Sequence, residues 1–157
     1  MKPTPKGWPR LSSSIFYNDA AKAIDWLCEA FAFEVRLRVE GEDVDGGGAV
    51  IHHSELVFGE ALVMVGQAGR TTPGREKWPQ FASPASVGGM NTQCLLVFVD
   101  DVDSHCERAR AAGAVIVDEP KVHDYGEAYW ADRSYGASDI EGHLWWFTQR
   151  LRDPAGS

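Results

Sequence analysis

Cysteine, positive charge and long apolar runs are all scarce in this sequence. Cys28, Cys94 and Cys106 are the only cysteines, an odd number without a CxxC pair, and this pattern favours a reducing cytoplasmic setting over a disulfide framework. The 15 Lys and Arg are outnumbered by 23 Asp and Glu, giving a net charge of −8, which argues against binding to nucleic acid or to an anionic membrane surface. No apolar run approaches the roughly 20 residues of a membrane span.

The N-terminal stretch Met1–Lys6 lacks the apolar core of a signal peptide, which again predicts a cytoplasmic protein. What the chain does contain is enough apolar material for a folded interior, because 44% of its 157 residues are hydrophobic. The length fits one ordinary domain, or two small units that share a core.

The first part of the chain predicts a strand, a helix and three strands. Residues 1–10 hold three Pro and are expected to form an extended arm. Asn18 or Asp19 can cap a helix, because a short acceptor side chain bonds the free backbone N–H groups there. The helix is indicated by an apolar stripe at Ile24, Leu27, Cys28 and Phe31. The expected strands are 11–17, 34–40, 49–58 and 60–65, with a Gly-rich loop at 41–48.

The same order then returns after residues 66–91, which are rich in Gly, Pro, Ser and Thr and are interpreted as a linker or a flap. Asp101 is the second helix cap, and Gly113 ends that helix. The expected strands are 92–99, 114–117 and two within 130–149, joined by a turn at 139–142, and residues 150–157 form a polar tail.

Two landmarks indicate an internal repeat. Asp19 and Asp101, the two caps, lie 82 positions apart, and Gly59 and Gly142, which each precede a closing strand, lie 83 positions apart. Agreement within one residue favours duplication. The sequence therefore predicts two βαβββ modules, at 11–65 and 92–149.

Paired βαβββ modules with these motifs resemble the vicinal oxygen chelate superfamily of glyoxalases, bleomycin-resistance proteins and extradiol dioxygenases, and in particular its PhnB-like branch. That branch usually has Gly at Ala131 and Pro at Ile140. The resemblance covers about residues 10–149 and implies an α+β fold in which two modules form a half-open mixed-sheet cleft with helices outside. The matching stretches are Tyr17-Asn18-Asp19-Ala20-Ala21, Trp26-Leu27, Val99-Asp100-Asp101-Val102-Asp103, Ala112-Gly113-Ala114, Trp130-Ala131-Asp132-Arg133-Ser134 and Asp139-Ile140-Glu141-Gly142-His143.

The resemblance also implies where a divalent metal would bind, on the first and last strands of each module. Those positions fall on Ser12 and Cys94, and on Trp146 with either Val63 or Met64 as its counterpart. None offers a His nitrogen or a carboxylate oxygen, so we expect no metal, no other cofactor and no catalytic set.

Other titratable residues are interpreted as structural or as lining. Only one of His52 and His53 can face the cleft, as a polar lining residue. His105 is expected on a solvated helix face. The trio His123, Asp124 and Glu127 is expected in a loop. Asp132 with Arg133 is interpreted as a structural ion pair, and His143 as a structural hydrogen-bonding residue. Ser12, Ser13 and Ser14 lack the partners of a nucleophile.

Strand alternation then predicts an apolar and aromatic cleft. Trp145 and Phe147 should pack toward a helix, while such a lining suits a flat, partly apolar molecule. The predicted ligand-binding residues are Ser12, Ser14, Phe16, Cys94, Leu96, Phe98, Trp130 and Trp146, with Leu144 and Thr148 on the same face.

Three functions are compatible with these patterns. The first is a metal-free protein that sequesters a planar small molecule. The second is a divergent metal-dependent lyase, isomerase or dioxygenase that uses other ligands, such as His52, Glu55 or Glu60. The third is a module for subunit association. An open sheet edge needs a cover, so a homodimer is expected.

Overall fold

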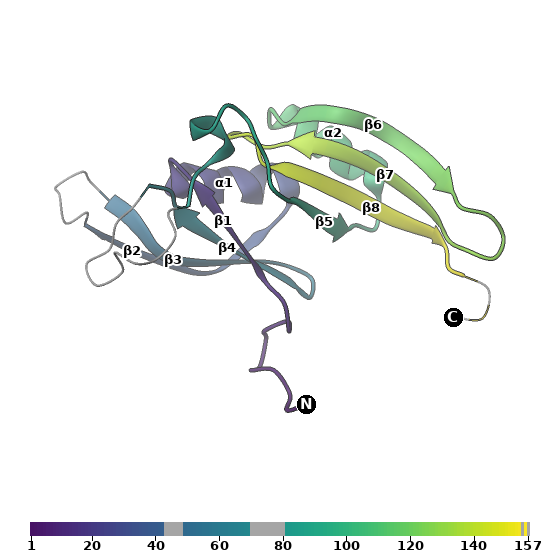
Figure 1. Ribbon diagram of the computed structural model, residues 1–157, viewed down its shortest axis with the longest axis horizontal. Coiled ribbons are helices and arrows are strands. Elements are labelled where there is room, and N and C mark those ends of the chain that lie inside the picture. Colours follow the sequence, from purple (N-terminus) through teal and green to yellow (C-terminus); the bar gives the residue numbers. More distant parts are fainter. Residues whose placement is uncertain (43–48, 70–80, 155, 157) are drawn as a thin grey trace. The chain divides into compact units, whose positions relative to one another are not determined.

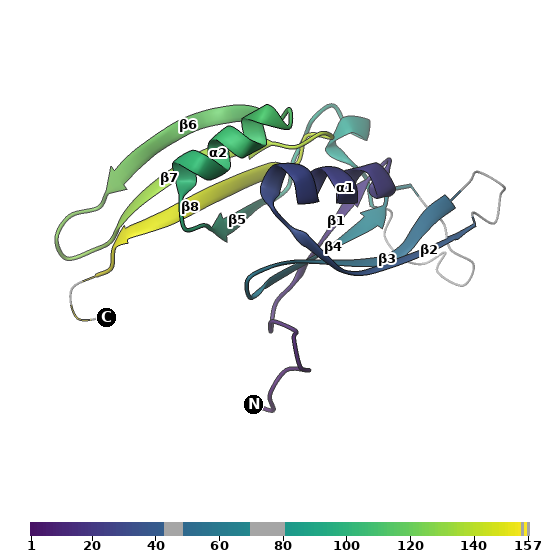
Figure 2. The same ribbon diagram turned by 180° about the vertical axis from the view of Figure 1, so that it is seen from behind.

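The computed structural model describes residues 1–42, 49–69, 81–154 and 156, which form two compact units, Met1–Met90 and Asn91–Ser157. Each unit is a βαβββ module in which one helix packs on one face of a four-stranded mixed sheet (Figure 1 and, from behind, Figure 2). The duplication and the α+β fold class predicted from the sequence are confirmed.

The first module places its strands in the order β1-β4-β3-β2. β1 runs parallel to β4, whereas β3 is antiparallel to both β4 and β2. A short 3-10 helix, η1, follows the sheet. Its elements are β1 (Ser13–Tyr17), α1 (Ala20–Phe31), β2 (Glu34–Glu42), β3 (Ala49–Phe58), β4 (Ala61–Gln67) and η1 (Pro84–Ser86).

The second module repeats this topology in the order β5-β8-β7-β6, with β5 parallel to β8 and the other pairs antiparallel. Its elements are β5 (Cys94–Phe98), α2 (Val102–Ala111), β6 (Val115–Asp124), β7 (Ala131–Ser138) and β8 (Leu144–Arg152).

The repeat extends to single hydrogen bonds. Asp19 and Asp101 cap the two helices, as predicted, through bonds to Lys22 N and Ser104 N. A second contact at each helix start comes from the last strand, because the side-chain oxygens of Gln67 and Gln149 accept from the first helical N–H at 3.3 Å in both modules. Free N–H groups of a helix start are thus satisfied from two sides.

The helix-facing side of each sheet forms the core. In the second module Tyr135, Trp145 and Phe147 are fully buried, which confirms the prediction that Trp145 and Phe147 pack toward a helix. The carboxylate of Asp139 closes the turn before β8, accepting from Glu141 N, His143 N and, at 3.0 Å, the Trp145 indole. The first module buries Ile15, Tyr17, Leu56 and Val65 against Ile24, Leu27 and Phe31.

Several predicted boundaries differ from the structure. β6 runs to Asp124, beyond the expected strand 114–117, so His123 and Asp124 lie in a strand rather than a loop. β8 continues to Arg152, into the stretch expected to be tail, since Arg150 and Arg152 form ion pairs with Asp132 and Asp124. β2 and β4 also run two residues further than expected. The rest of the Gly-rich loop, 43–48, and residues 70–80 of the expected linker lie outside the described residues.

Candidate functional site

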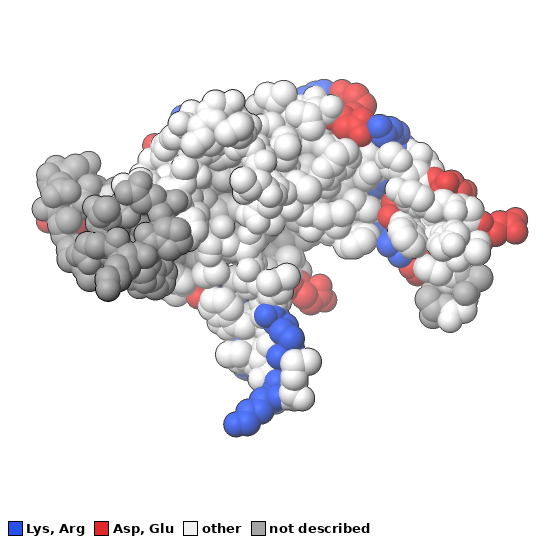
Figure 3. Space-filling view, viewed as in Figure 1, with Lys and Arg blue, Asp and Glu red and all other residues white. Residues whose placement is uncertain are grey.

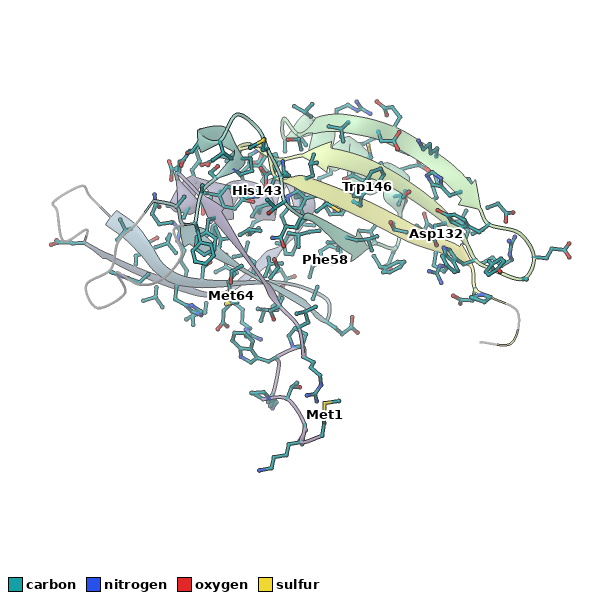
Figure 4. The ribbon with its side chains drawn as sticks, in the orientation of Figure 1. Met1, Phe58, Met64, Asp132, His143 and Trp146 are labelled. Atoms are coloured by element: carbon teal, nitrogen blue, oxygen red, sulfur yellow. The ribbon has the colours of Figure 1, made fainter. Side chains whose placement is uncertain are left out.

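The sheet face that each helix leaves uncovered is the candidate binding surface, here called the open face. The strand register places Ser14 beside Met64 on the open face of the first module, and Leu96 beside Trp146 on that of the second. Met64 and Trp146 therefore hold equivalent positions, which decides between Val63 and Met64 in favour of Met64. Figure 4 labels both residues on their sheets.

The open face of the second module presents exposed apolar and aromatic side chains. Leu96 is 59% exposed, Phe98 53% and Trp130 37%. Trp146 is half-buried, and its indole lies near Gly136 of β7, because a methyl group at Gly136 would stand 3.4 Å from the ring and 3.1 Å from a Val117 methyl group. The Trp146 ring therefore lies beside the β7 backbone at van der Waals distance. Leu96, Phe98, Trp130 and Trp146 are called the aromatic platform below.

Arg150 provides the charge at one end of this aromatic platform. Its guanidinium carbon lies 5.5 Å from the Phe98 ring centre and 5.8 Å from that of Trp130, within cation–π distance of both. Arg150 also donates to Asp132 at 2.5 Å and to Asp153 at 2.9 Å. Arg133, in contrast, pairs with Asp103 of α2, so the predicted Asp132–Arg133 ion pair is wrong: neighbours along β7 face opposite sides of the sheet.

The open face of the first module is built differently around Phe16. A methyl group at Gly66 would lie 2.8 Å from the Phe16 ring, so this ring rests on bare backbone. Its other side stacks on Phe81, with ring centres 4.0 Å apart and planes inclined by 1°. Phe16 is therefore sandwiched, and the exposed surface at this point belongs to Phe81.

A chain of charged side chains lies on the same face, on β2 and β3. Glu55 accepts from Arg36 Nε at 2.7 Å and lies 3.0 Å from His53 Nε2. The bonds to His53 and Arg36 lower the pKa of the Glu55 carboxyl below its usual value. Arg36 also lies 5.0 Å from the Trp8 ring centre and donates to the Gly7 carbonyl, which attaches the N-terminal arm to this face.

The metal positions that the resemblance implies offer at most one metal ligand. Ser12, Met64 and Trp146 supply a hydroxyl, a thioether and an indole, and only Cys94 could supply a thiolate, whereas a divalent metal needs several imidazole, thiolate or carboxylate donors together. Across residues 1–42, 49–69 and 81–154, no three His, Cys, Asp or Glu side chains gather closely enough to hold an ion. This donor set does not fit a divalent metal.

The remaining predicted residues lie in varied surroundings. Cys94 is exposed beside Leu144, two residues from the Leu96–Trp146 pair. The Ser12 hydroxyl is buried at the base of the arm with no hydrogen-bond partner among the described residues. Thr148 is buried although it shares the open face. His105 is buried rather than solvated, since it bonds the Tyr135 hydroxyl at 2.7 Å, and burial raises the pKa of Tyr135.

Sequence reasoning missed four contributors: Phe81, Gly136, Arg150 and the joint role of Arg36 with Glu55. His53 and Glu55 are two apart on a strand, and this spacing places both on one face. Phe81 could not be assigned, because its segment has no periodicity.

No helix among the described residues is long and apolar enough to cross a membrane.

Comparison with known proteins adds a family. The sequence profile of the Glyoxalase/Bleomycin resistance protein/Dioxygenase superfamily matches residues 11–147. An uncharacterized protein from Mycobacterium bovis is 30% identical over 145 residues, covering 92% of this chain and 86% of its own.

Solved structures share the fold. TioX from Micromonospora sp. ML1 is 32% identical with a TM-score of 0.65, over 91% of this chain and 99% of its own. The fosfomycin resistance protein FosX from Listeria monocytogenes is 13% identical, with a TM-score of 0.56 over 90% of this chain and 92% of its own. At that identity the likeness to FosX concerns the fold alone.

Proposed function

The chain belongs to the Glyoxalase/Bleomycin resistance protein/Dioxygenase superfamily, and on that premise we propose that it binds a flat apolar or aromatic small molecule without a metal, in the manner of a sequestering or resistance protein. The observation that carries this proposal is the aromatic platform, in which Leu96, Phe98 and Trp130 are exposed on the open face beside Trp146. Exposed aromatic rings on a rigid sheet favour stacking of a planar ligand.

Arg150 gives the aromatic platform a polar end. Because its guanidinium is already bonded to two carboxylates, it contributes a fixed planar cation rather than a free charge. We therefore expect this end of the aromatic platform to favour a ligand with a polarisable ring system, placed beside Phe98 and Trp130, over a small anion.

The alternative, a metal-dependent lyase, isomerase or dioxygenase, needs ligands such as His52, Glu55 or Glu60. Both Glu55 oxygens are already used by Arg36 and His53, and the His52 ring lies over Gly41, at a register shift of β3. Elemental analysis of untagged protein separates the two functions. We expect far less than one equivalent of metal per chain, not restored by nickel, zinc, iron or manganese, whereas a full equivalent would favour the enzyme.

The binding proposal is tested with acridine and quinoline as planar probes, titrated by calorimetry. Trp146→Ala and Phe98→Ala should each weaken binding by roughly tenfold, the order expected for one lost stacking contact with its buried area. Leu151→Ala is the matched control, an exposed apolar residue of β8 that is not part of the aromatic platform. Equal affinities in all four proteins would contradict the proposal.

We also place the chain in the PhnB-like branch, in the cytoplasm and in a homodimer. The dimer is supported by the exposed apolar side chains of Val35, Leu37 and Val39 on the edge strand β2, since such edges call for a cover. Light scattering should give the mass of two chains, and a monomer would contradict this assignment.

A further inference from the structure

The charged chain on the first module has a buried centre and an exposed end. Glu55 is only 7% exposed, whereas the His53 side chain is 41% exposed. The two lie two residues apart on β3 and therefore point to the same open face. A buried carboxylate is costly unless it is paired, so the contacts of Glu55 define its function.

Each oxygen of Glu55 has its own partner. Oε2 accepts from Arg36 Nε at 2.7 Å, and Oε1 lies 3.0 Å from His53 Nε2. These two bonds lower the pKa of the Glu55 carboxyl, so it is ionised at neutral pH. An ionised carboxylate only accepts hydrogen bonds, and the proton of the neutral imidazole must therefore be on Nε2.

That tautomer leaves Nδ1 of His53 with a lone pair. A carboxylate bonded to the other ring nitrogen fixes the tautomer and orientation of an imidazole, as in the carboxylate–histidine pairs of catalytic and metal sites. An ion pair that merely joined β2 to β3 would need Arg36 and Glu55, but not an exposed histidine whose tautomer is fixed.

The arm and the neighbouring strand shape the surroundings of this nitrogen. Trp8 and Gly7 of the arm contact Arg36, and the arm carries basic side chains, seen in blue in Figure 3. On β2, Val39 pairs with His53 and Leu37 pairs with Glu55, and both side chains are exposed. A proton acceptor next to exposed apolar side chains suits a ring that carries a hydroxyl group.

We propose that His53, oriented by Glu55 and Arg36, is a binding site for a weakly acidic hydroxyl on an apolar ring or conjugated system, that is, a phenol or an enol. The hydroxyl donates to Nδ1 of His53. When the proton transfers, the O–H bond breaks, an Nδ1–H bond forms, and an oxyanion faces an imidazolium whose charge Glu55 stabilises. This site lies on the first module and is independent of the aromatic platform, so either can fail without the other.

The test compares p-nitrophenol with p-nitroanisole, which has the same ring but no acidic proton, on the full-length protein. The phenol should bind about tenfold more tightly, as one hydrogen bond to a charge-assisted acceptor allows. Its phenolate absorption band should appear at a lower pH than in free solution. In ¹⁵N-labelled protein, the Nδ1 signal of His53 should shift toward that of a protonated nitrogen with the phenol only.

His53→Gln should remove both the preference and the absorption change, while His123→Gln, the same substitution on β6 of the second module, should retain them. Glu55→Gln should reduce the preference for p-nitrophenol over p-nitroanisole and allow neutral His53 to carry its proton on either ring nitrogen. The proposal is overturned if the two probes bind equally, if nitrophenol does not bind, or if its ionisation persists in His53→Gln. The NMR comparison on the unmodified protein decides the matter should a variant fail to fold. Acridine binding, which tests the aromatic platform, should be the same in His53→Gln.

Discussion

Phe16 and Phe98 occupy equivalent positions in the two modules and have opposite surroundings. Phe16 pairs with Gly66, rests on its backbone and is covered by Phe81, whereas Phe98 pairs with Thr148 and remains exposed. The duplicated topology sets the direction in which each side chain points. The residue beside it, and whatever segment folds back over it, decides whether that side chain can meet a ligand.

The same contrast holds for polar groups. The first module carries the Arg36–Glu55–His53 chain. By strand register Leu56, paired with Val63, corresponds to Ala137, paired with Trp145, so the position of Glu55 corresponds to Gly136 in the second module. The second module instead carries Trp146 beside Gly136. We therefore expect the first open face to serve proton acceptance and the second to serve stacking.

The largest expected difference concerns the core positions Trp145 and Val63, which are equivalent in the repeat and both helix-facing. Trp145→Ala should cost about 3–5 kcal/mol of unfolding free energy, because it leaves a large cavity and removes the indole bond to Asp139. Val63→Ala should cost about 1–3 kcal/mol. Urea unfolding monitored by far-ultraviolet circular dichroism measures both, and equal losses would mean that the two cores contribute alike.

The next largest effect is expected from exchanging the residues paired with Phe16 and Phe98, which are Gly66 and Thr148. Gly66→Thr places atoms where the Phe16 ring lies and should destabilise the first module by about 1–3 kcal/mol, as overpacking does. It should also expel Phe81 from its stack, which near-ultraviolet circular dichroism would detect. The reverse change, Thr148→Gly, should leave that signal intact, and a loss of the signal there would refute the assignment of the stack to Phe16 and Phe81.

The stability of the first module should depend more strongly on acidic pH than that of the second, because of Glu55. The folded-state pKa of Glu55 lies below the unfolded value of about 4.3, so its contribution to stability is fully present above that pH and declines as pH falls through the folded pKa. Glu55→Gln should therefore flatten the pH dependence of the unfolding midpoint below pH 5 or so. Asp124→Asn, which removes an exposed pair with Arg152, should change it less. Identical acid profiles for the wild type and Glu55→Gln would show that Glu55 is not the responsive group.

The smallest losses of stability are expected at the two glutamines that bond the helix N-termini. Gln67→Leu and Gln149→Leu each remove the bond to a helix N-terminus, and Gln67→Leu also removes the bond that Gln67 Nε2 donates to the Asn18 carbonyl. Each substitution should cost about 0.5–1.5 kcal/mol. Thermal unfolding of the two variants should shift by similar amounts. A large difference between the two shifts would show that the equivalent hydrogen bonds do not contribute equally to the stability of the two modules.

Much of the fold could be predicted from the sequence because its signals are local. Asp19 and Asp101 are caps that act over three residues, and Trp145 and Phe147 follow from strand alternation. The sandwich of Phe16 could not be predicted, since Phe81 is 65 residues away in a segment without a pattern. Likewise, the partner of Asp132 was misassigned because ion pairing depends on cross-strand register, which places Arg150 opposite it, rather than on adjacency.

The turn at Asp139 has a further consequence for following the molecule in time. Among the tryptophans in the described residues, Trp145 is the one whose side chain is fully buried with its indole proton held by a carboxylate. That proton can exchange with deuterium only when the second module opens, whereas exchange at the exposed Trp130 requires no such event. The hydrogen–deuterium exchange rate of the Trp145 indole would therefore report how often the second module opens, independently of the first module.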